Sequence, residues 1–274
     1  MPGGAVVQQA GLTGESMTSY RVDYDSLAAT YNRRFSKPDG GVGAALLAVV
    51  QKVQPERLLE VGCGTGHWLA LLGALEPLCC GLDLSVGMLR QARQHDAALR
   101  LARGRATCLP FADGLFDLIF CVNAIHHFGD PSRFIAEAVR LLRPGGTLAV
   151  VGSGPHGCRD SWYVYDYFAG VYESDLARFP TWQAVRGWME ASGLQDLESG
   201  EVEHISSVWH GREVLGDPFL EKRSCSQLAL LTEEAYAAGR RRIEAALAEA
   251  EAKGETLVFR SDISLRMLSG RKPD

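Results

Sequence analysis

A short stretch from Leu58 to Trp68, LLEVGCGTGHW, constrains the fold more than any other part of the chain. An apolar run leads directly into glycines at alternate positions, Gly62, Gly64 and Gly66. Glycine tolerates positive φ and carries no Cβ, so a ligand can approach the backbone of such a turn closely. We therefore expect a buried strand, then a ligand-binding turn, then the start of a helix.

The spacing of these glycines excludes two common phosphate-binding loops. A dinucleotide fingerprint, G-x-G-x-x-G, requires a third glycine at position 67, where this chain has His67. A Walker loop requires a lysine after its last glycine, and no lysine follows here. The remaining pattern is E-x-G-x-G-x-G, which begins at Glu60.

Apolar runs and helical patterns alternate through the first half of the chain. Four runs are expected as strands, over residues 58–61, 78–83, 116–122 and 147–152. Continuous apolar strands that alternate with helices are typical of a parallel sheet covered on both faces. The sequence therefore predicts a doubly wound α/β fold.

The glycine pattern and the acid before it resemble motif I of the class I S-adenosylmethionine-dependent methyltransferases. The resemblance continues in the same order through GLDLS, RATCLPFADGLFDLIFCV and LLRPGGTLAVVG, and it covers roughly residues 55–152. It implies a seven-stranded, mostly parallel Rossmann-like sheet with S-adenosylmethionine as the cofactor. The final two strands of that sheet are expected near the C-terminus, with a helix beginning after Thr232 between them.

The resemblance also implies which residues contact the cofactor. Asp83 ends the second strand about 20 residues after the first glycine, where α/β folds place an acid for the ribose hydroxyls. Glu60 is expected to organise the loop or to meet the methionine amino group. The other expected contacts are Gly62, Gly64 and Gly66 in the loop, Leu84, Ala106 and Thr107 at the adenine, and Asn123 at the methionine end.

One position departs from the family pattern. Many members carry an aspartate that accepts from the adenine amino group, and here Arg105 precedes Ala106. Arginine has donors only, so it cannot accept that hydrogen bond. Either the backbone at Ala106 and Thr107 reads the adenine alone, or the side-chain contact lies elsewhere.

The segment before the core is expected to close over the cofactor. Residues 1–19 lack periodicity and are expected to be a disordered tail, and residues 20–45 resemble the lid helix of small-molecule methyltransferases. Tyr24 and Tyr31 are seven residues apart, which places both on one helical face. Their rings suit a sulfonium cation, although the same pattern fits tyrosines that only pack on the domain.

The acceptor is expected where the fourth strand ends. His126 and His127 follow that strand in NAIHHF, and an imidazole is a suitable base near neutral pH. Methyl transfer can also draw much of its rate from orientation of the reactants, which would leave both histidines structural. Both roles stay open for this pair.

Residues 46–152 are expected to form the cofactor-binding core, and residues 153–274 the substrate cap and the last strands. An aromatic-rich segment begins this second part, and it fits either a substrate pocket or a packed helix stripe. The expected substrate contacts are Trp162, Tyr163 and Tyr167.

Composition narrows the class of protein. The chain has 274 residues, 46% hydrophobic residues and a formal net charge of −5, which gives no general attraction for nucleic acid. Without a signal-peptide pattern or a membrane-length apolar run, we expect a cytoplasmic protein with no membrane contact. Seven scattered cysteines form no CxxC pattern, and no metal site is expected.

The sequence therefore predicts methyl transfer to a small-molecule acceptor. A catalytically silent S-adenosylmethionine-binding protein and a nucleic-acid or protein methyltransferase remain as alternatives. The sequence leaves the oligomeric state open between a monomer and a homodimer.

Overall fold

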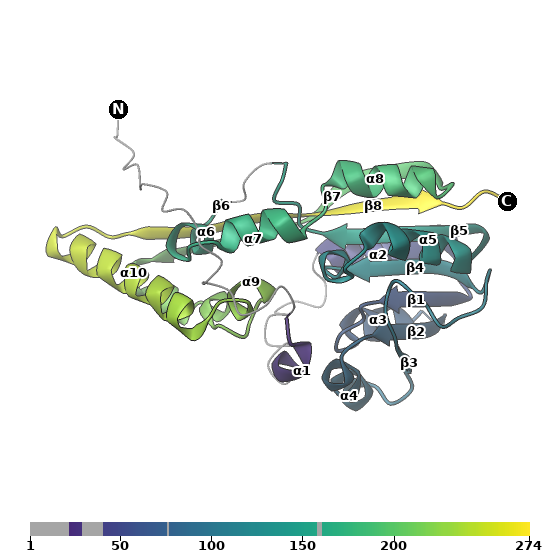
Figure 1. Ribbon diagram of the computed structural model, residues 1–274, viewed down its shortest axis with the longest axis horizontal. Helices are drawn as coiled ribbons and strands as arrows, with labels where there is room; N and C mark the ends of the chain where they lie inside the picture. Colours follow the sequence, from purple (N-terminus) through teal and green to yellow (C-terminus); the bar gives the residue numbers. More distant parts are fainter. Residues whose placement is uncertain (1–21, 29–40, 76, 158–160) are drawn as a thin grey trace.

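The computed structural model describes residues 22–28, 41–75, 77–157 and 161–274 (Figure 1). The expected disordered tail, Tyr31 and most of the expected lid segment lie outside these residues. Two parts of that segment are described: the short helix α1 (Tyr24–Leu27) and the start of α2 (Gly41–Val53).

A single mixed sheet organises the molecule, and its strand order is β3-β2-β1-β4-β5-β8-β6, with β7 pairing on β8. The first five strands are parallel, and β8 runs antiparallel to β5, β6 and β7. This arrangement confirms the predicted doubly wound fold. The strands are β1 (Arg57–Val61), β2 (Leu78–Asp83), β3 (Arg100–Arg103), β4 (Phe116–Val122), β5 (Leu142–Gly152), β6 (Ser161–Trp162), β7 (Gln195–His210) and β8 (Val258–Arg271).

Helices cover both faces of the parallel part, and the β4 side chains alternate between them. Ile119 and Cys121 pack in one cluster with α5 (Pro131–Leu141) and α8 (Trp182–Ala191). Leu118 and Phe120 pack in the other with α2, α3 (His67–Gly73) and α4 (Val86–His95). A strand buried on both faces explains the continuous apolar run in its sequence.

The strand count differs slightly from the prediction. The two-residue strand β6 adds an eighth strand, because β8 extends past its pairing with β5 and meets Ser161 and Trp162 there. β5 also begins at Leu142, earlier than expected. The N–H of Gly145 donates to the carbonyl oxygen of Lys272, and the N–H of Lys272 donates to that of Gly146. These hydrogen bonds hold the start of β5 against the sheet.

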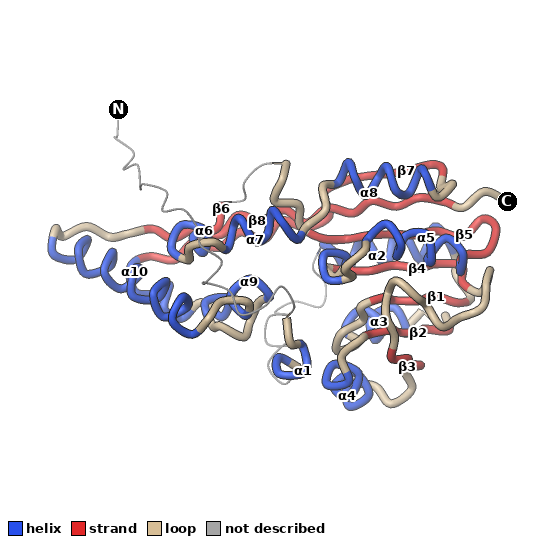
Figure 2. The backbone as a smooth tube through the Cα atoms, in the orientation of Figure 1, coloured by secondary structure: helices blue, strands red, loops and turns tan. Residues whose placement is uncertain are grey.

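The long strands β7 and β8 reach from the core into a second packed region, the cap (Figures 1 and 2). Its apolar cluster joins β6 and the outer part of β8 to four helices and two 3₁₀ turns. These elements are α6 (Tyr163–Tyr167), α7 (Val171–Arg178), α9 (Ser226–Ala229), α10 (Glu233–Ala252), η3 (Gly211–Gly216) and η4 (Pro218–Leu220). Thr232 caps α10 by accepting from the N–H of Ala235, as its sequence predicts.

A glycine inside α10 sets how closely that helix packs on the cap. A Cβ on Gly239 would lie 2.2 Å from the buried ring of Phe168. We expect Gly239→Ala to lower the free energy of unfolding by about 1–3 kcal/mol, because overpacking forces this ring to move. Gly187→Ala in α8 is the matched control, since nothing lies within 4 Å of that Cβ. It should stabilise the helix by up to about 1 kcal/mol, and equal effects of the two changes in urea denaturation would contradict this packing account.

Candidate active site

The glycine loop joins β1 to α3 in a conformation that requires glycine. Gly62, Gly64 and Gly66 have φ values of +75°, +52° and +76°, which residues other than glycine rarely adopt. A Cβ on Gly62 would also lie 2.6 Å from the Cβ of Ala124. The loop therefore presents bare backbone at the carboxyl end of β1, as the sequence predicts.

Asp83 ends β2 and is tied to this loop. Its carboxylate accepts hydrogen bonds from the N–H of Gly64 (2.9 Å) and from the N–H of Ser85 (2.8 Å). Burial raises the pKa of Asp83, and these backbone donors oppose that rise. The backbone of Leu84 also donates to this carboxylate, and since a carboxylate offers about four acceptor sites, acceptor capacity remains for a hydroxyl of a ligand. Leu84, the next residue, is 50% exposed beside it.

Glu60 lies beneath the loop and is 1% exposed. Its Oε2 has no hydrogen-bond partner in the part of the chain that the structure describes. Burial, with a smaller contribution from the negative charge of Asp83, raises the pKa of Glu60 well above its usual range. An unpaired, buried acceptor at this place fits the amino group of a ligand.

The raised pKa of Glu60 predicts how the free energy of unfolding depends on pH. A carboxyl whose folded pKa is raised stabilises the fold while it is protonated, and stability falls as the pH rises through that folded pKa. Glu60→Gln mimics the protonated form, so near pH 4, below the unfolded pKa of about 4.3, its free energy of unfolding should match the wild type within about 0.5 kcal/mol. As the pH rises above that value, the variant should become relatively more stable, because the unfolded wild type then gains the free energy of ionising Glu60 while the folded protein keeps it protonated. A loss above about 1 kcal/mol in denaturant titrations near pH 6 would show that Glu60 is charged there.

The expected adenine side lies after β3. Ala106 is buried, Thr107 is half-buried and Arg105 is exposed. Arg133 donates to the carbonyl oxygen of Thr107 (2.9 Å), which fixes the backbone there.

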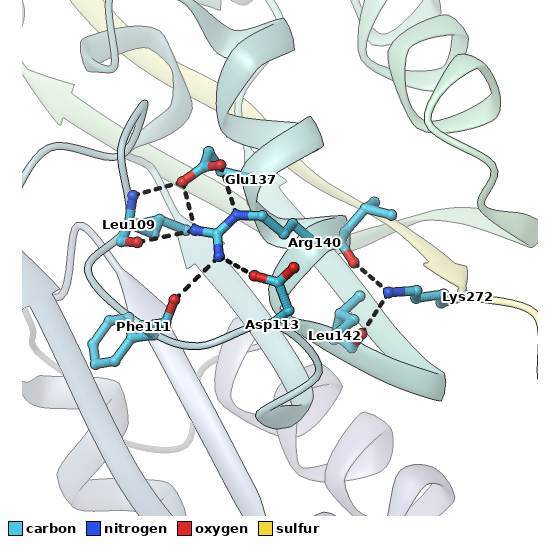
Figure 3. A network of polar contacts seen from close by, with 8 residues as sticks. Leu109, Phe111, Asp113, Glu137, Arg140, Leu142 and Lys272 are labelled. Carbon is cyan, nitrogen blue, oxygen red and sulfur yellow. Dashed lines mark hydrogen bonds and ion pairs between the residues drawn. The ribbon is translucent and has the colours of Figure 1, made fainter.

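A polar network holds the end of the same loop against α5 (Figure 3). Arg140 donates to the carbonyl oxygens of Leu109 and Phe111 and pairs with Glu137 and Asp113. Glu137 in turn accepts from the N–H of Leu109. The loop beside Ala106 and Thr107 is therefore positioned by α5, through contacts that sequence reasoning did not identify.

The expected catalytic residues gather at the end of β4. Asn123 follows the strand with φ +50°, and its N–H donates to the carbonyl of Val151 (2.8 Å). The hydroxyl of Tyr24 and Nε2 of His127 are 2.6 Å apart. The ring of His126 stacks on Phe179, with centroids 3.8 Å apart. The structure thus joins the predicted lid tyrosine to one predicted base.

Contacts between α1 and α4 place Tyr24 there. Asp25 accepts from the hydroxyl of Ser85 and from the N–H of Gly87, both at 2.6 Å, and these hydrogen bonds lower the pKa of Asp25. Leu27 packs on Met88 in the same contact. These contacts therefore anchor α1 at the start of α4, next to Asp83 and Leu84.

A cavity of about 130 Å³ lies between the core, α1 and the cap. This volume is large enough for several waters or for a small organic molecule. The core and α1 contribute Asn123, His126, His127, Ser153 and Tyr24. The long strands and the cap contribute Trp162, Phe179, Ile205, Ser207, Asp217, Phe219, Cys225, Ser226, Gln227, Ser261, Ile263 and Leu265.

Two of the three expected substrate contacts do not line this cavity. Trp162 does, but Tyr163 is 3% exposed and donates its hydroxyl to Asp217 (2.7 Å). Tyr167 packs its ring on Phe259, with centroids 5.4 Å apart. Both tyrosines lie in the cap cluster because α6 turns that side of the aromatic segment inward.

The described residues give two further findings. They include no group of three or more His, Cys, Asp or Glu side chains that could hold a metal ion. None of the described helices is long and apolar enough to cross a membrane.

Comparisons with known proteins relate this chain to methyltransferases. Residues 59–150 match a family model described as a methyltransferase domain. The chain is 34% identical over 198 residues to the malonyl-[acyl-carrier protein] O-methyltransferase of Methylococcus capsulatus, covering 69% of this chain and 62% of the relative. It is 35% identical over 157 residues to phthiotriol/phenolphthiotriol dimycocerosates methyltransferase 1 of Mycobacterium ulcerans, covering 56% of this chain and 54% of that one.

A solved structure extends the comparison to the fold. A crystal structure of a putative methyltransferase from Bacillus halodurans superposes with a TM-score of 0.59 at 22% identity, over 86% of this chain and 100% of that chain. The chain spans between half and two thirds of the length of the two curated relatives. The core therefore matches the methyltransferase family model, and the fold matches that of the solved structure. Neither comparison identifies the acceptor.

Proposed function

The chain belongs to the class I S-adenosylmethionine-dependent methyltransferases, and from this premise we propose that it methylates a small molecule bound in the cavity at Asn123. The observation that carries the proposal is that two sites lie at the same edge of the sheet. The glycine loop and Asp83 lie at the carboxyl ends of β1 and β2, and the cavity begins at the carboxyl end of β4 beside them. Ligands of open α/β sheets bind at this edge.

The residues of the loop fit S-adenosylmethionine. Asp83 would accept from the two ribose hydroxyls, Leu84 would lie against the adenine, and Glu60 would meet the methionine amino group. The backbone at Ala106 and Thr107 would border the adenine, and Tyr24 would cover the methionine end near Asn123. When bound, the cofactor supplies a methyl group on a sulfonium, and the neutral thioether that remains after transfer is a good leaving group.

The chain itself would orient the acceptor and remove its proton. The cavity walls would position the acceptor for attack on the methyl group, and such orientation can account for a large part of the rate. His127 would take the proton of the acceptor, because it lines the cavity and the Tyr24 hydroxyl, 2.6 Å from its Nε2, holds the ring in place. Closure by α1 and the cap would exclude water from the reacting atoms.

Asp83 gives the cofactor part of this proposal a direct test. Asp83→Asn should weaken S-adenosylhomocysteine binding by about 2 kcal/mol, roughly 30-fold, because the amide loses charge and acceptor capacity toward the ribose. Asp96→Asn is the matched control, since Asp96 also accepts from a backbone N–H two residues on and lies at the other end of α4. In calorimetry, Asp96→Asn should bind S-adenosylhomocysteine as tightly as the wild type. Equal affinities of the wild type, Asp83→Asn and Asp96→Asn would disprove this placement of Asp83.

Activity is tested by release of S-adenosylhomocysteine from a panel of hydroxyl, amine, thiol and carboxylate acceptors. The two curated relatives are named for a malonyl-acyl carrier protein and for phthiotriol dimycocerosates, so both acceptor types belong in the panel. Acceptor-dependent release that Asp83→Asn reduces supports the proposal. Cofactor binding without release for any acceptor would favour a catalytically silent binding protein.

A further inference from the structure

The cap wall of the cavity contains a buried carboxylate, Asp217. It is 5% exposed and lies between the turns η3 and η4. One of its oxygens accepts from the N–H of Phe219 (2.9 Å), and the other accepts from the hydroxyl of Tyr163 (2.7 Å). Burial raises the pKa of Tyr163, so this hydroxyl is a neutral donor. A carboxylate offers about four acceptor sites, and the two donors leave about half of them for a ligand.

Asp217 forms no ion pair within the part of the chain that the structure describes. The cavity lining includes no described lysine or arginine. Arg240 acts electrostatically on the Tyr163 and Tyr236 hydroxyls, and it makes no ion pair with Asp217. A buried charge is costly unless it is paired, so the cavity favours a positively charged partner here.

Two aromatic rings line the cavity near this carboxylate. Trp162 directly precedes Tyr163, the residue that donates to Asp217, and Phe219 follows Asp217 by two positions. Aromatic faces attract cations, and the attraction strengthens when the cation is desolvated. A buried carboxylate with two neighbouring rings is a combination that suits an ammonium group better than a neutral or anionic one.

We propose that the cap end of the cavity binds a protonated amine of the methyl acceptor, with Asp217 as its counterion and Trp162 and Phe219 beside it. This inference rests on the proposed function, because it assigns the substrate class of the same cavity. The acceptor then spans the cavity, with its nucleophilic atom toward His127 and its ammonium group toward Asp217.

The test uses three probes of similar size that differ in charge: phenethylamine, phenethyl alcohol and 3-phenylpropionate. Each is titrated calorimetrically into the full chain saturated with S-adenosylhomocysteine. We expect phenethylamine to bind at least about tenfold more tightly than the alcohol, and the propionate to bind most weakly. Equal affinities, tightest binding of the propionate, or no binding of phenethylamine at millimolar concentrations would overturn the proposal.

Two variants separate the charge of Asp217 from its hydrogen bond to Tyr163. Asp217→Asn should abolish the preference for phenethylamine, whereas Tyr163→Phe removes the hydrogen bond, keeps the charge and should retain the preference. A preference that survives Asp217→Asn would contradict the proposal, and thermal unfolding checks that both variants are folded. If Asp217→Asn does not fold, the probe ranking in the wild type and in Tyr163→Phe still decides. Failure of the chain to bind S-adenosylhomocysteine would instead contradict the proposed function.

Discussion

His127→Gln should lower kcat by about 100-fold or more while S-adenosylhomocysteine affinity stays within about twofold. Glutamine approximates the size of the ring and its hydrogen-bonding capacity, but it cannot take a proton from the acceptor. The change is measured with the acceptor found in the release screen, under saturating cofactor. Tyr24→Phe should cause a smaller loss and should shift the pH profile of kcat, because it removes the hydroxyl that contacts His127 Nε2 at 2.6 Å.

The neighbouring histidine is the matched control. His126 lines the same cavity, but its ring stacks on Phe179, so His126→Gln should reduce kcat only a few-fold, as expected for a packing change. Similar small losses for both histidines, with the fold intact, would identify them as structural and leave orientation as the source of the rate. A loss larger at His126 than at His127 would exchange their proposed roles.

Asp175→Asn should lower the free energy of unfolding by about 3–5 kcal/mol, because it leaves the Arg178 guanidinium buried without a counterion. The side chains of this pair are 1% and 6% exposed, and Arg178 Nη2 lies 2.6 Å from Asp175 Oδ1. Asp175 also accepts from Tyr165 and from Gln227, so it connects α7 to α6 and α9. Gln227 lines the cavity, and loss of Asp175 should therefore loosen the cap wall as well.

An exposed ion pair on the next helix provides the comparison. Nη1 of Arg186 lies 3.7 Å from Oε1 of Glu190, and the two side chains are 40% and 56% exposed. Glu190→Gln should change stability by less than about 0.5 kcal/mol, because solvent screens the pair. Both variants are compared in urea denaturation, and a loss below about 1 kcal/mol for Asp175→Asn would mean that water or another group compensates Arg178.

Local sequence patterns predicted the core because its signals are short-range. β2 and β4 occupy the residues expected from their apolar runs, and β1 begins one residue earlier. Gly62, Gly64 and Gly66 have positive φ values, as their spacing predicts, and a Cβ on Gly62 or Gly66 would clash with neighbouring side chains. The hydrogen bond from Gly64 to Asp83 joins the two motifs that carried the family resemblance.

The cap was less predictable because its contacts join distant segments. Asp217 and Gln227 line the cavity together with Asn123, about a hundred residues earlier in the chain, and no local spacing links them. The aromatic segment indicated a packed element, but only the three-dimensional arrangement separates Trp162, which lines the cavity, from Tyr163 and Tyr167, which do not. The contact of Tyr24 with His127 likewise depends on how α1 docks on α4.

The most direct test of the account is calorimetric titration of the full chain with S-adenosylmethionine, S-adenosylhomocysteine and NAD. The glycine spacing, Asp83 and the buried Glu60 predict tight one-to-one binding of the first two ligands and no binding of NAD. Failure of both sulfur-containing ligands to bind, or NAD binding as tightly as they do, would contradict the cofactor assignment and the methyl transfer proposed from it.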